Sequence, residues 1–196
     1  MHLKTLLLIT PWALVGLRLA LTPIVVLLAS HHIQELPMLL TVLAALISDI
    51  YDGILARRLG VATAALRRAD SIADTIFYLG AAWSAWIVSP LAVRSVAKLL
   101  LALGVLEISR YVIDYVKFRR EASYHSYLAK LWGLVLASAL IMLLSFSVSG
   151  WLLRAALWLG IVSDVEGMAI SFVLPAWAHD VRSIFHAHRL RKAIVH

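Results

Sequence analysis

Four aspartates lie close together in an otherwise hydrophobic chain: Asp49, Asp52, Asp70 and Asp74. Asp49 and Asp52 are three residues apart, and Asp70 and Asp74 are four apart, so each pair would occupy one face of a helix. Carboxylate oxygens are hard ligands that suit Mg²⁺, Mn²⁺ or Ca²⁺. Four of them can hold two divalent ions, the arrangement that stabilises the attacking and leaving oxygens in phosphoryl transfer. The pattern therefore predicts a divalent-metal site that acts on phosphates.

The residues beside the first pair fit the same chemistry. Gly53 and Ala56 are small and would let a bulky ligand approach the helix backbone, and Arg57 supplies a fixed positive charge for a phosphate. A second interpretation applies to Asp70 alone, which could cap the start of a helix and interact with its dipole. Helix capping does not explain why four carboxylates occur together with Gly53, Ala56 and Arg57 in one short segment.

The composition indicates a membrane protein. Of the 196 residues, 62% are hydrophobic, whereas a soluble domain has about 45–50%. A membrane-spanning helix needs about 20 apolar residues, and we expect six spans, over residues 11–30, 38–57, 70–88, 93–116, 127–147 and 153–174. We therefore expect an all-α integral membrane protein with one domain over residues 1–196. Residues 2–10 would form an N-terminal lead-in, and residues 177–196 an interfacial amphipathic segment.

The basic residues predict the orientation in the membrane. Most of them fall in the N-terminus, the 57–69 loop, the 117–121 loop and the C-terminus: Lys4, Arg57, Arg58, Arg67, Arg68, Lys117, Arg119, Arg120, Arg182, Arg189, Arg191 and Lys192. The opposite side has only Arg94, Lys98 and Arg154. The positive-inside rule then places both termini and the aspartates at the cytoplasmic face. The net charge of +7 suits anionic lipids or phosphates better than nucleic acid, because the basic residues are scattered over loops.

Residues 49–74 resemble the signature of the CDP-alcohol phosphatidyltransferases. That signature reads Asp-x-x-Asp-Gly-x-x-Ala-Arg, then eight residues, Gly, three residues and Asp-x-x-x-Asp. The chain keeps every spacing, but Leu66 stands where the signature has its second glycine. In the family this glycine helps to form the cytidine pocket. A leucine there would narrow the pocket or shift the nucleotide, which leaves the donor open.

The resemblance implies transfer of a phosphatidyl group from a CDP-linked lipid, typically CDP-diacylglycerol, to an alcohol in phospholipid synthesis, with release of CMP. It implies a two-metal site with Mg²⁺ or Mn²⁺, in which Asp49, Asp52 and Asp70 are the principal ligands. Asp74 would be the general base and a further ligand. The implied nucleotide contacts are Asp52, Gly53, Ala56, Arg57 and Leu66. The implied setting is a bacterial inner membrane, with membrane lipids and a second copy of the chain as partners.

Other charged residues fall within the expected spans. Lys130 resembles lysines that bind the acceptor phosphate in some family members, although a lysine that snorkels to the membrane interface is an equal alternative. Glu107, Arg110 and Asp114 are spaced to pair among themselves. We favour this set of structural ion pairs over a role of Arg110 in acceptor binding. Arg18 resembles an arginine in the first span of many family members, and no role is assigned to it. Asp164 and Glu166 would belong to the last span or to a break in it, and a second ion or acceptor contact there is an alternative.

Two other functions fit the aspartates. A divalent-cation transporter would also need carboxylates within the membrane, but it would place them near the middle of the bilayer, often in repeated halves, and no repeat is visible. A degenerate relative could bind metal but have lost transfer because of Leu66. The acceptor stays open among glycerol 3-phosphate, inositol phosphate, inositol, serine and another lipid.

Overall fold

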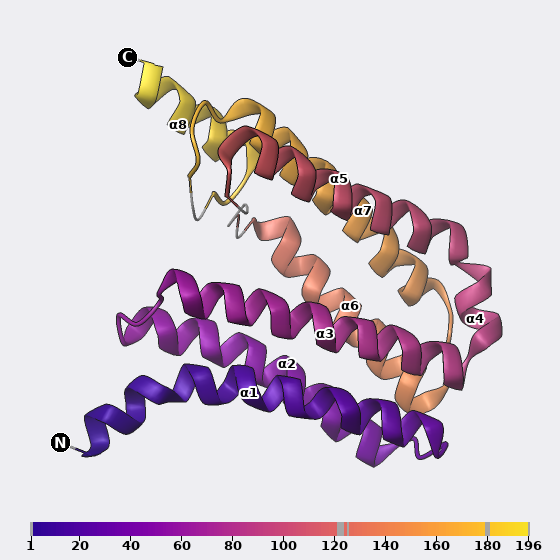
Figure 1. Cartoon of the computed structure of the whole chain (residues 1–196). Coiled ribbons are helices and arrows are strands. Elements are labelled where there is room, and N and C mark those ends of the chain that lie inside the picture. Colours follow the sequence, from indigo (N-terminus) through magenta and orange to yellow (C-terminus); the bar gives the residue numbers. More distant parts are fainter. Residues whose placement is uncertain (1, 121–123, 125, 179–180, 196) are drawn as a thin grey trace. The chain divides into compact units, whose positions relative to one another are not determined.

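The computed structural model describes residues 2–120, 124, 126–178 and 181–195, with side-chain surroundings between residues 9 and 192. The described residues form helices and no strand (Figure 1), which confirms the prediction of an all-α protein. The helices are α1 (His2–Ser30), α2 (Leu36–Arg58), α3 (Ala64–Val88), α4 (Pro90–Ser95), α5 (Ala97–Phe118), α6 (Tyr127–Phe146), α7 (Trp151–Val173) and α8 (Ile184–Val195). The predicted lead-in at residues 2–10 is part of α1. The side chain of Lys4 and all of Glu121 lie outside the described residues.

Among the described residues, five helices are long and apolar enough to cross a membrane. They are α1 from Ile9 onwards, α2, α3, α6 and α7, and they indicate an integral membrane protein. The predicted span 93–116 falls on α4 and α5, which are separated at Val96. α5 has 22 residues, but it does not qualify by composition because it carries the charged residues Lys98, Glu107, Arg110, Asp114 and Lys117. The count of six spans is therefore not confirmed.

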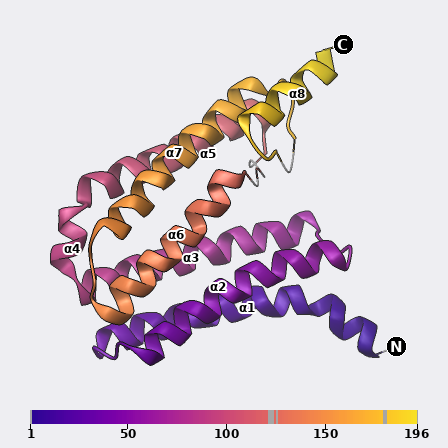
Figure 2. The same cartoon turned by 180° about the vertical axis from the view of Figure 1, so that it is seen from behind.

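The chain divides into two compact units, of which the first contains Met1–Val93 and Leu140–Ser149. In this unit α1 packs against both α2 and α3, as both views of the cartoon show (Figures 1 and 2). A Cβ atom on Gly80 of α3 would lie 2.6 Å from Cγ2 of Thr22 on α1. The glycine thus lets α1 and α3 approach closely, which fixes α1 beside the segment that carries Asp70 and Asp74.

The ends of α2 and α3 set the positions of the aspartates. Gly60 follows α2 with a φ of +69°, the left-handed conformation expected of a glycine after a helix. The side chain of Thr63 accepts a hydrogen bond from the backbone N–H of Leu66 at 3.2 Å and caps α3. α3 therefore begins more than a turn before Asp70. The interpretation of Asp70 as a helix cap is wrong, because Thr63 holds that position.

The second unit contains Arg94–Ala139 and Gly150–His196. Its helices α5 and α7 lie side by side, and α8 packs against α7 (Figure 2). Val181 and Ala187 are buried together with Ile170 and Leu174, so the apolar side of the tail docks on α7. The tail helix begins at Ile184 rather than at 177. Its place at the membrane interface stays a prediction, and residues 179, 180 and 196 of the tail lie outside the described residues.

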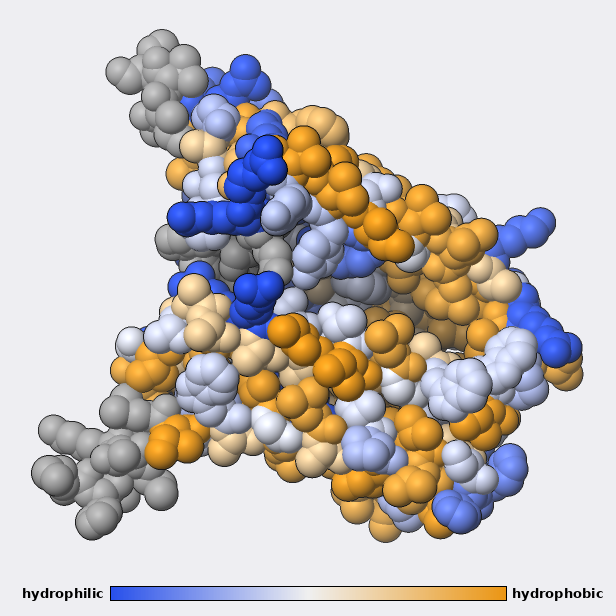
Figure 3. Space-filling model, in the orientation of Figure 1, coloured by the Kyte–Doolittle hydropathy of each residue, from blue (hydrophilic) through white to orange (hydrophobic). Residues whose placement is uncertain are grey.

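Hydrophobic side chains cover much of the surface of each unit in the view of Figure 3. On α5 the exposed apolar residues recur at intervals of three and four: Leu101, Val105, Ile108, Val112 and Tyr115. Residues with this spacing lie on one side of a helix. One side of α5 is thus apolar and exposed despite the charges on the helix as a whole.

Candidate functional site

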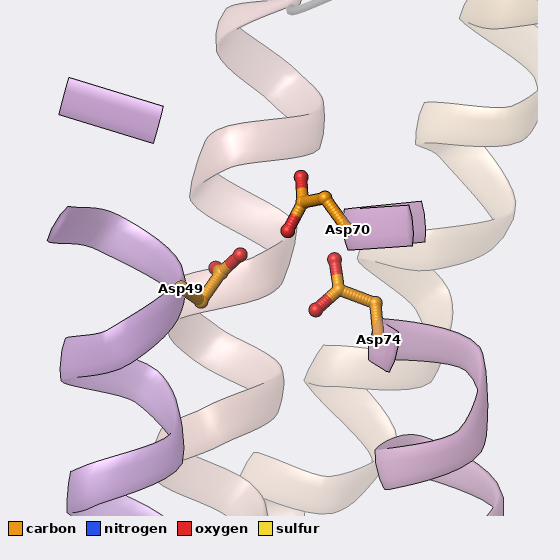
Figure 4. Close-up of side chains that lie close together, drawn as sticks. All are labelled: Asp49, Asp70 and Asp74. Carbon is orange, nitrogen blue, oxygen red and sulfur yellow. The ribbon is translucent and has the colours of Figure 1, made fainter. Parts of the chain in front are cut away.

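Three of the four aspartates converge. Asp49 extends from α2, and Asp70 and Asp74 extend from adjacent turns of α3, so that their side chains point toward one another (Figure 4). One carboxylate oxygen of each lies within 4.8 Å of the others. The three carboxylates are partly exposed, so a ligand can reach them. The sequence predicts that the two aspartate pairs converge, and these three residues do so.

Asp52 is not part of this group of three and is 3% exposed. It shares Arg18 of α1, which is itself 1% exposed, with the other aspartates. Nη2 of Arg18 donates to Oδ2 of Asp52. Nη1 of the same guanidinium donates to Oδ1 of Asp74, and to Oδ1 of Asp70 at 2.9 Å. It also lies 3.4 Å from Oδ1 of Asp49. One arginine therefore contacts all four carboxylates.

The arginine at the centre of the site has no assigned role from the sequence. Its location could have indicated a role, because an arginine within an apolar span needs counter-charges, and ionisable residues within a membrane pair with one another. Only the packing of α1 against α2 and α3 shows that Arg18 finds all four aspartates at once.

The donor set fits divalent cations. Four carboxylates facing one guanidinium leave three negative charges in a largely apolar setting, where unpaired charge is unfavourable. The convergent donors are all carboxylate oxygens, the ligands that Mg²⁺, Mn²⁺ and Ca²⁺ prefer. Asp49, Asp70 and Asp74 would hold such an ion, and Asp52, which shares Arg18 with them, is the fourth carboxylate of the site.

Gly53 and Arg57 lie next to each other on the surface of α2. A Cβ atom on Gly53 would lie 3.3 Å from Nη1 of Arg57, so the guanidinium folds back over the glycine. Arg57 is exposed and near the aspartates in sequence, as a phosphate-binding arginine should be. A larger residue at position 53 would crowd this guanidinium.

Ala56 and Leu66 are buried in the packing of the first unit. Leu66 is 4% exposed and Ala56 is 6% exposed, and they form a hydrophobic cluster with Val15 and Ala73. The cluster joins α1, α2 and α3 directly beneath the loop that connects the two aspartate-bearing helices. Leu66 thus occupies the place of the signature glycine as a packed core residue, and the assignment of both residues as nucleotide contacts stays a prediction.

A family model for CDP-alcohol phosphatidyltransferase matches residues 8–162 of the chain. The chain belongs to the CDP-alcohol phosphatidyltransferase family. Members of this family transfer a phosphatidyl group from a CDP-alcohol and are generally dependent on a divalent metal. Neither the curated proteins nor the solved structures contain a match to the chain. Family membership favours a transferase over a cation transporter, and the convergent aspartates lie within the matched range.

Arg110 lies in the second unit and is paired there. Its Nη2 donates to Oε1 of Glu107 at 2.6 Å, and its Nε lies 3.3 Å from Oδ1 of Asp164 on α7. A Cβ atom on Gly167 would lie 2.9 Å from Cδ of Arg110, so the side chain of Arg110 packs directly against α7 at this glycine. The predicted pairing of Glu107 with Arg110 is confirmed, and Asp164, two residues beyond the range of the family match, is the second partner.

Asp114 is predicted to belong to the same set of ion pairs as Glu107 and Arg110, but its hydrogen-bond partner is a different residue. It accepts a hydrogen bond from Oγ of Ser171, which is 3.2 Å from the hydroxyl of Tyr124. Nζ of Lys117 donates to the backbone oxygens of Ser171 at 2.8 Å and Phe172 at 3.2 Å, near the end of α7. These contacts tie the last turns of α5 and α7 together.

Lys130 is an exposed side chain on α6. Its exposure is compatible both with acceptor binding and with a lysine that reaches the membrane interface. Arg110, by contrast, already has two carboxylate partners. Acceptor binding by either residue stays a prediction.

Proposed function

We propose that the protein transfers a phosphatidyl group from CDP-diacylglycerol to the hydroxyl group of an alcohol in phospholipid synthesis, and releases CMP. The convergence of Asp49, Asp70 and Asp74 is the observation that supports this proposal most directly. It comes from the two helices that carry the family signature, in the arrangement that a cation-assisted reaction of a diphosphate requires.

Asp49, Asp52, Asp70 and Asp74 are proposed to hold two divalent ions, Mg²⁺ or Mn²⁺. When bound, such ions neutralise the diphosphate of the donor and the charge that develops on it during transfer. Arg57, exposed beside Gly53, is proposed to bind a phosphate of the CDP group. A guanidinium suits this role because it donates two parallel hydrogen bonds to one phosphate.

Asp74 is proposed to accept the proton of the attacking hydroxyl. The acceptor oxygen forms a bond to the phosphorus on the lipid side of the diphosphate. The bond between that phosphorus and the bridging oxygen breaks, and CMP leaves with the electron pair. The proposed location is the cytoplasmic side of a bacterial inner membrane, with the chain as a homodimer.

The test is CMP release from purified protein in lipid nanodiscs that contain CDP-diacylglycerol. Mg²⁺ or Mn²⁺ and one acceptor would be added at a time: glycerol 3-phosphate, inositol, inositol phosphate, serine or a lipid alcohol. We expect CMP only when a divalent ion and one class of acceptor are present. Metal binding without CMP release from any acceptor would identify a degenerate relative and contradict the proposal.

A further inference from the structure

Nη1 of Arg18 lies where three aspartates converge. It donates to Oδ1 of Asp70 at 2.9 Å and to Oδ1 of Asp74, and it is 3.4 Å from Oδ1 of Asp49. A divalent cation shared by these carboxylates would lie about 2.0–2.6 Å from its oxygen ligands. A guanidinium nitrogen and a metal ion therefore require the same space between the same oxygens.

The guanidinium has two ends with different surroundings. Nη2 contacts Asp52, which is 3% exposed, whereas Nη1 contacts the three partly exposed aspartates. Nε of Arg18 is buried without a hydrogen-bond partner among the described residues. Arg18 can therefore keep its pair with Asp52 while Nη1 leaves the other carboxylates. Its Nε–H group is then a further donor that could bind a ligand.

We propose that Arg18 is an internal competitor of the metal ions. It holds the four carboxylates of α2 and α3 together, and Nη1 withdraws from between Asp49, Asp70 and Asp74 when divalent ions bind. This inference rests on the proposed function, because it takes these aspartates as the metal site.

Charge balance indicates that the displaced arginine interacts with the donor. Two divalent ions carry four positive charges, which balance the four carboxylates. The guanidinium of Arg18, which is always protonated, is then left to offset the negative diphosphate of the donor. In this view Arg18 exchanges its carboxylate partners for the phosphate of the donor as the site is loaded.

The test is calorimetric titration of Mn²⁺ into EDTA-treated, desalted protein in nanodiscs without any CDP-lipid. Arg18→Gln removes the charge and replaces the guanidinium with a shorter, neutral amide, and we expect it to bind Mn²⁺ at least about tenfold more tightly than wild type. Arg18→Lys keeps the charge, but its single ammonium group cannot bridge Asp52 and the other three aspartates at once. We expect its affinity for Mn²⁺ to lie between the other two. Arg154→Gln, which removes an exposed arginine on α7, should match wild type.

Thermal unfolding of the same proteins gives a second measurement. In EDTA we expect Arg18→Gln to unfold at a lower temperature than wild type, because four carboxylates lose their counter-charge, and Mg²⁺ should restore most of the difference. If Arg18→Gln does not fold even with Mg²⁺, the titration of Arg18→Lys decides.

Two results would overturn the proposal. Equal or weaker Mn²⁺ binding by Arg18→Gln would show that the arginine does not compete with the ion. Wild-type affinity in Arg18→Lys would show that the residue acts through its charge alone and stays in place. If wild type and Arg154→Gln fail to bind Mn²⁺, the metal site itself is wrong, which is a failure of the proposed function and not of Arg18 as its competitor.

Discussion

Asp74 is the residue on which the proposed proton transfer depends. Asp74→Asn keeps the size of the side chain and a hydrogen-bond acceptor, but it removes the basic carboxylate. We expect CMP release to fall by about 10²–10⁴-fold, the range for loss of a general base. Donor binding should be largely retained, because Asp49, Asp52 and Asp70 remain. Measuring CMP release and CDP-diacylglycerol binding on the same preparation checks both parts.

The matched control for Asp74→Asn is Asp114→Asn. Asp114 is buried and accepts a hydrogen bond from Ser171 in the second unit, and an asparagine can accept the same bond. This variant should retain turnover to within a few fold. Near-normal turnover in Asp74→Asn would show that another group takes the proton.

The sequence predicted the aspartates better than it predicted their partner. Spacings of three and four residues on two consecutive helices were enough to infer that the two aspartate pairs converge, and Asp49, Asp70 and Asp74 do so. Arg18 lies 31 or more positions before them in the sequence, and no spacing rule connects it to them. Its contacts depend on α1 packing against both α2 and α3, which is a property of the folded unit rather than of any local pattern.

At the scale of single helices, Leu66 anchors the start of α3. It is 4% exposed and packs with Val15, Ala56 and Ala73. Leu66→Ala should lower the stability by about 2–5 kcal/mol, as is typical of truncating a buried leucine. The control is Leu79→Ala on the same helix, where the side chain is exposed and truncation should change the unfolding temperature little.

Donor affinity measured on Leu66→Ala separates packing from specificity. If the leucine narrows the nucleotide pocket, CDP-diacylglycerol should bind more tightly to this variant even though it unfolds at a lower temperature. A loss of donor affinity with unchanged stability would instead show that Leu66 contacts the nucleotide directly.

Gly167 allows α5 and α7 to pack around Arg110. Gly167→Ala would place a methyl group 2.9 Å from Cδ of an arginine held by Glu107 and Asp164. We expect a lower unfolding temperature, because the arginine must leave at least one carboxylate. Gly104→Ala on α5 is the control: its Cβ would meet nothing within 4 Å, and alanine favours a helix over glycine by about 1 kcal/mol. Equal behaviour of the two variants would show that Arg110 shifts at no cost.

Helix boundaries show where local patterns mislead. Residues 64–69 of α3 contain Arg67 and Arg68, so a hydrophobic window starts the span at Asp70. The structure starts it at Ala64, because Thr63 supplies the cap and Leu66 the first buried contact. Hydropathy records where a helix becomes apolar, whereas capping determines where it begins.

For the whole molecule, the open question is whether α5 crosses the membrane. Its charged residues Glu107, Arg110, Asp114 and Lys117 have partners within the second unit, while its exposed side carries an apolar row from Leu101 to Tyr115. A charged residue is tolerated in a span when it faces the interior and is paired. We therefore propose that α5 is the sixth span, with both chain termini in the cytoplasm.

Single cysteines test this topology directly, since the chain contains none. We would introduce them one at a time at exposed positions as Arg67→Cys, Lys98→Cys, Arg119→Cys and Ser149→Cys, and treat spheroplasts with a membrane-impermeant maleimide. With six spans, the cysteines at 98 and 149 are labelled from outside, and those at 67 and 119 only after the membrane is opened. Because Lys98 lies in the first turn of α5 and Arg119 directly follows the helix, labelling of both from the same side would show that α5 does not cross. The protein would then have five spans, and its C-terminus would lie outside the cytoplasm.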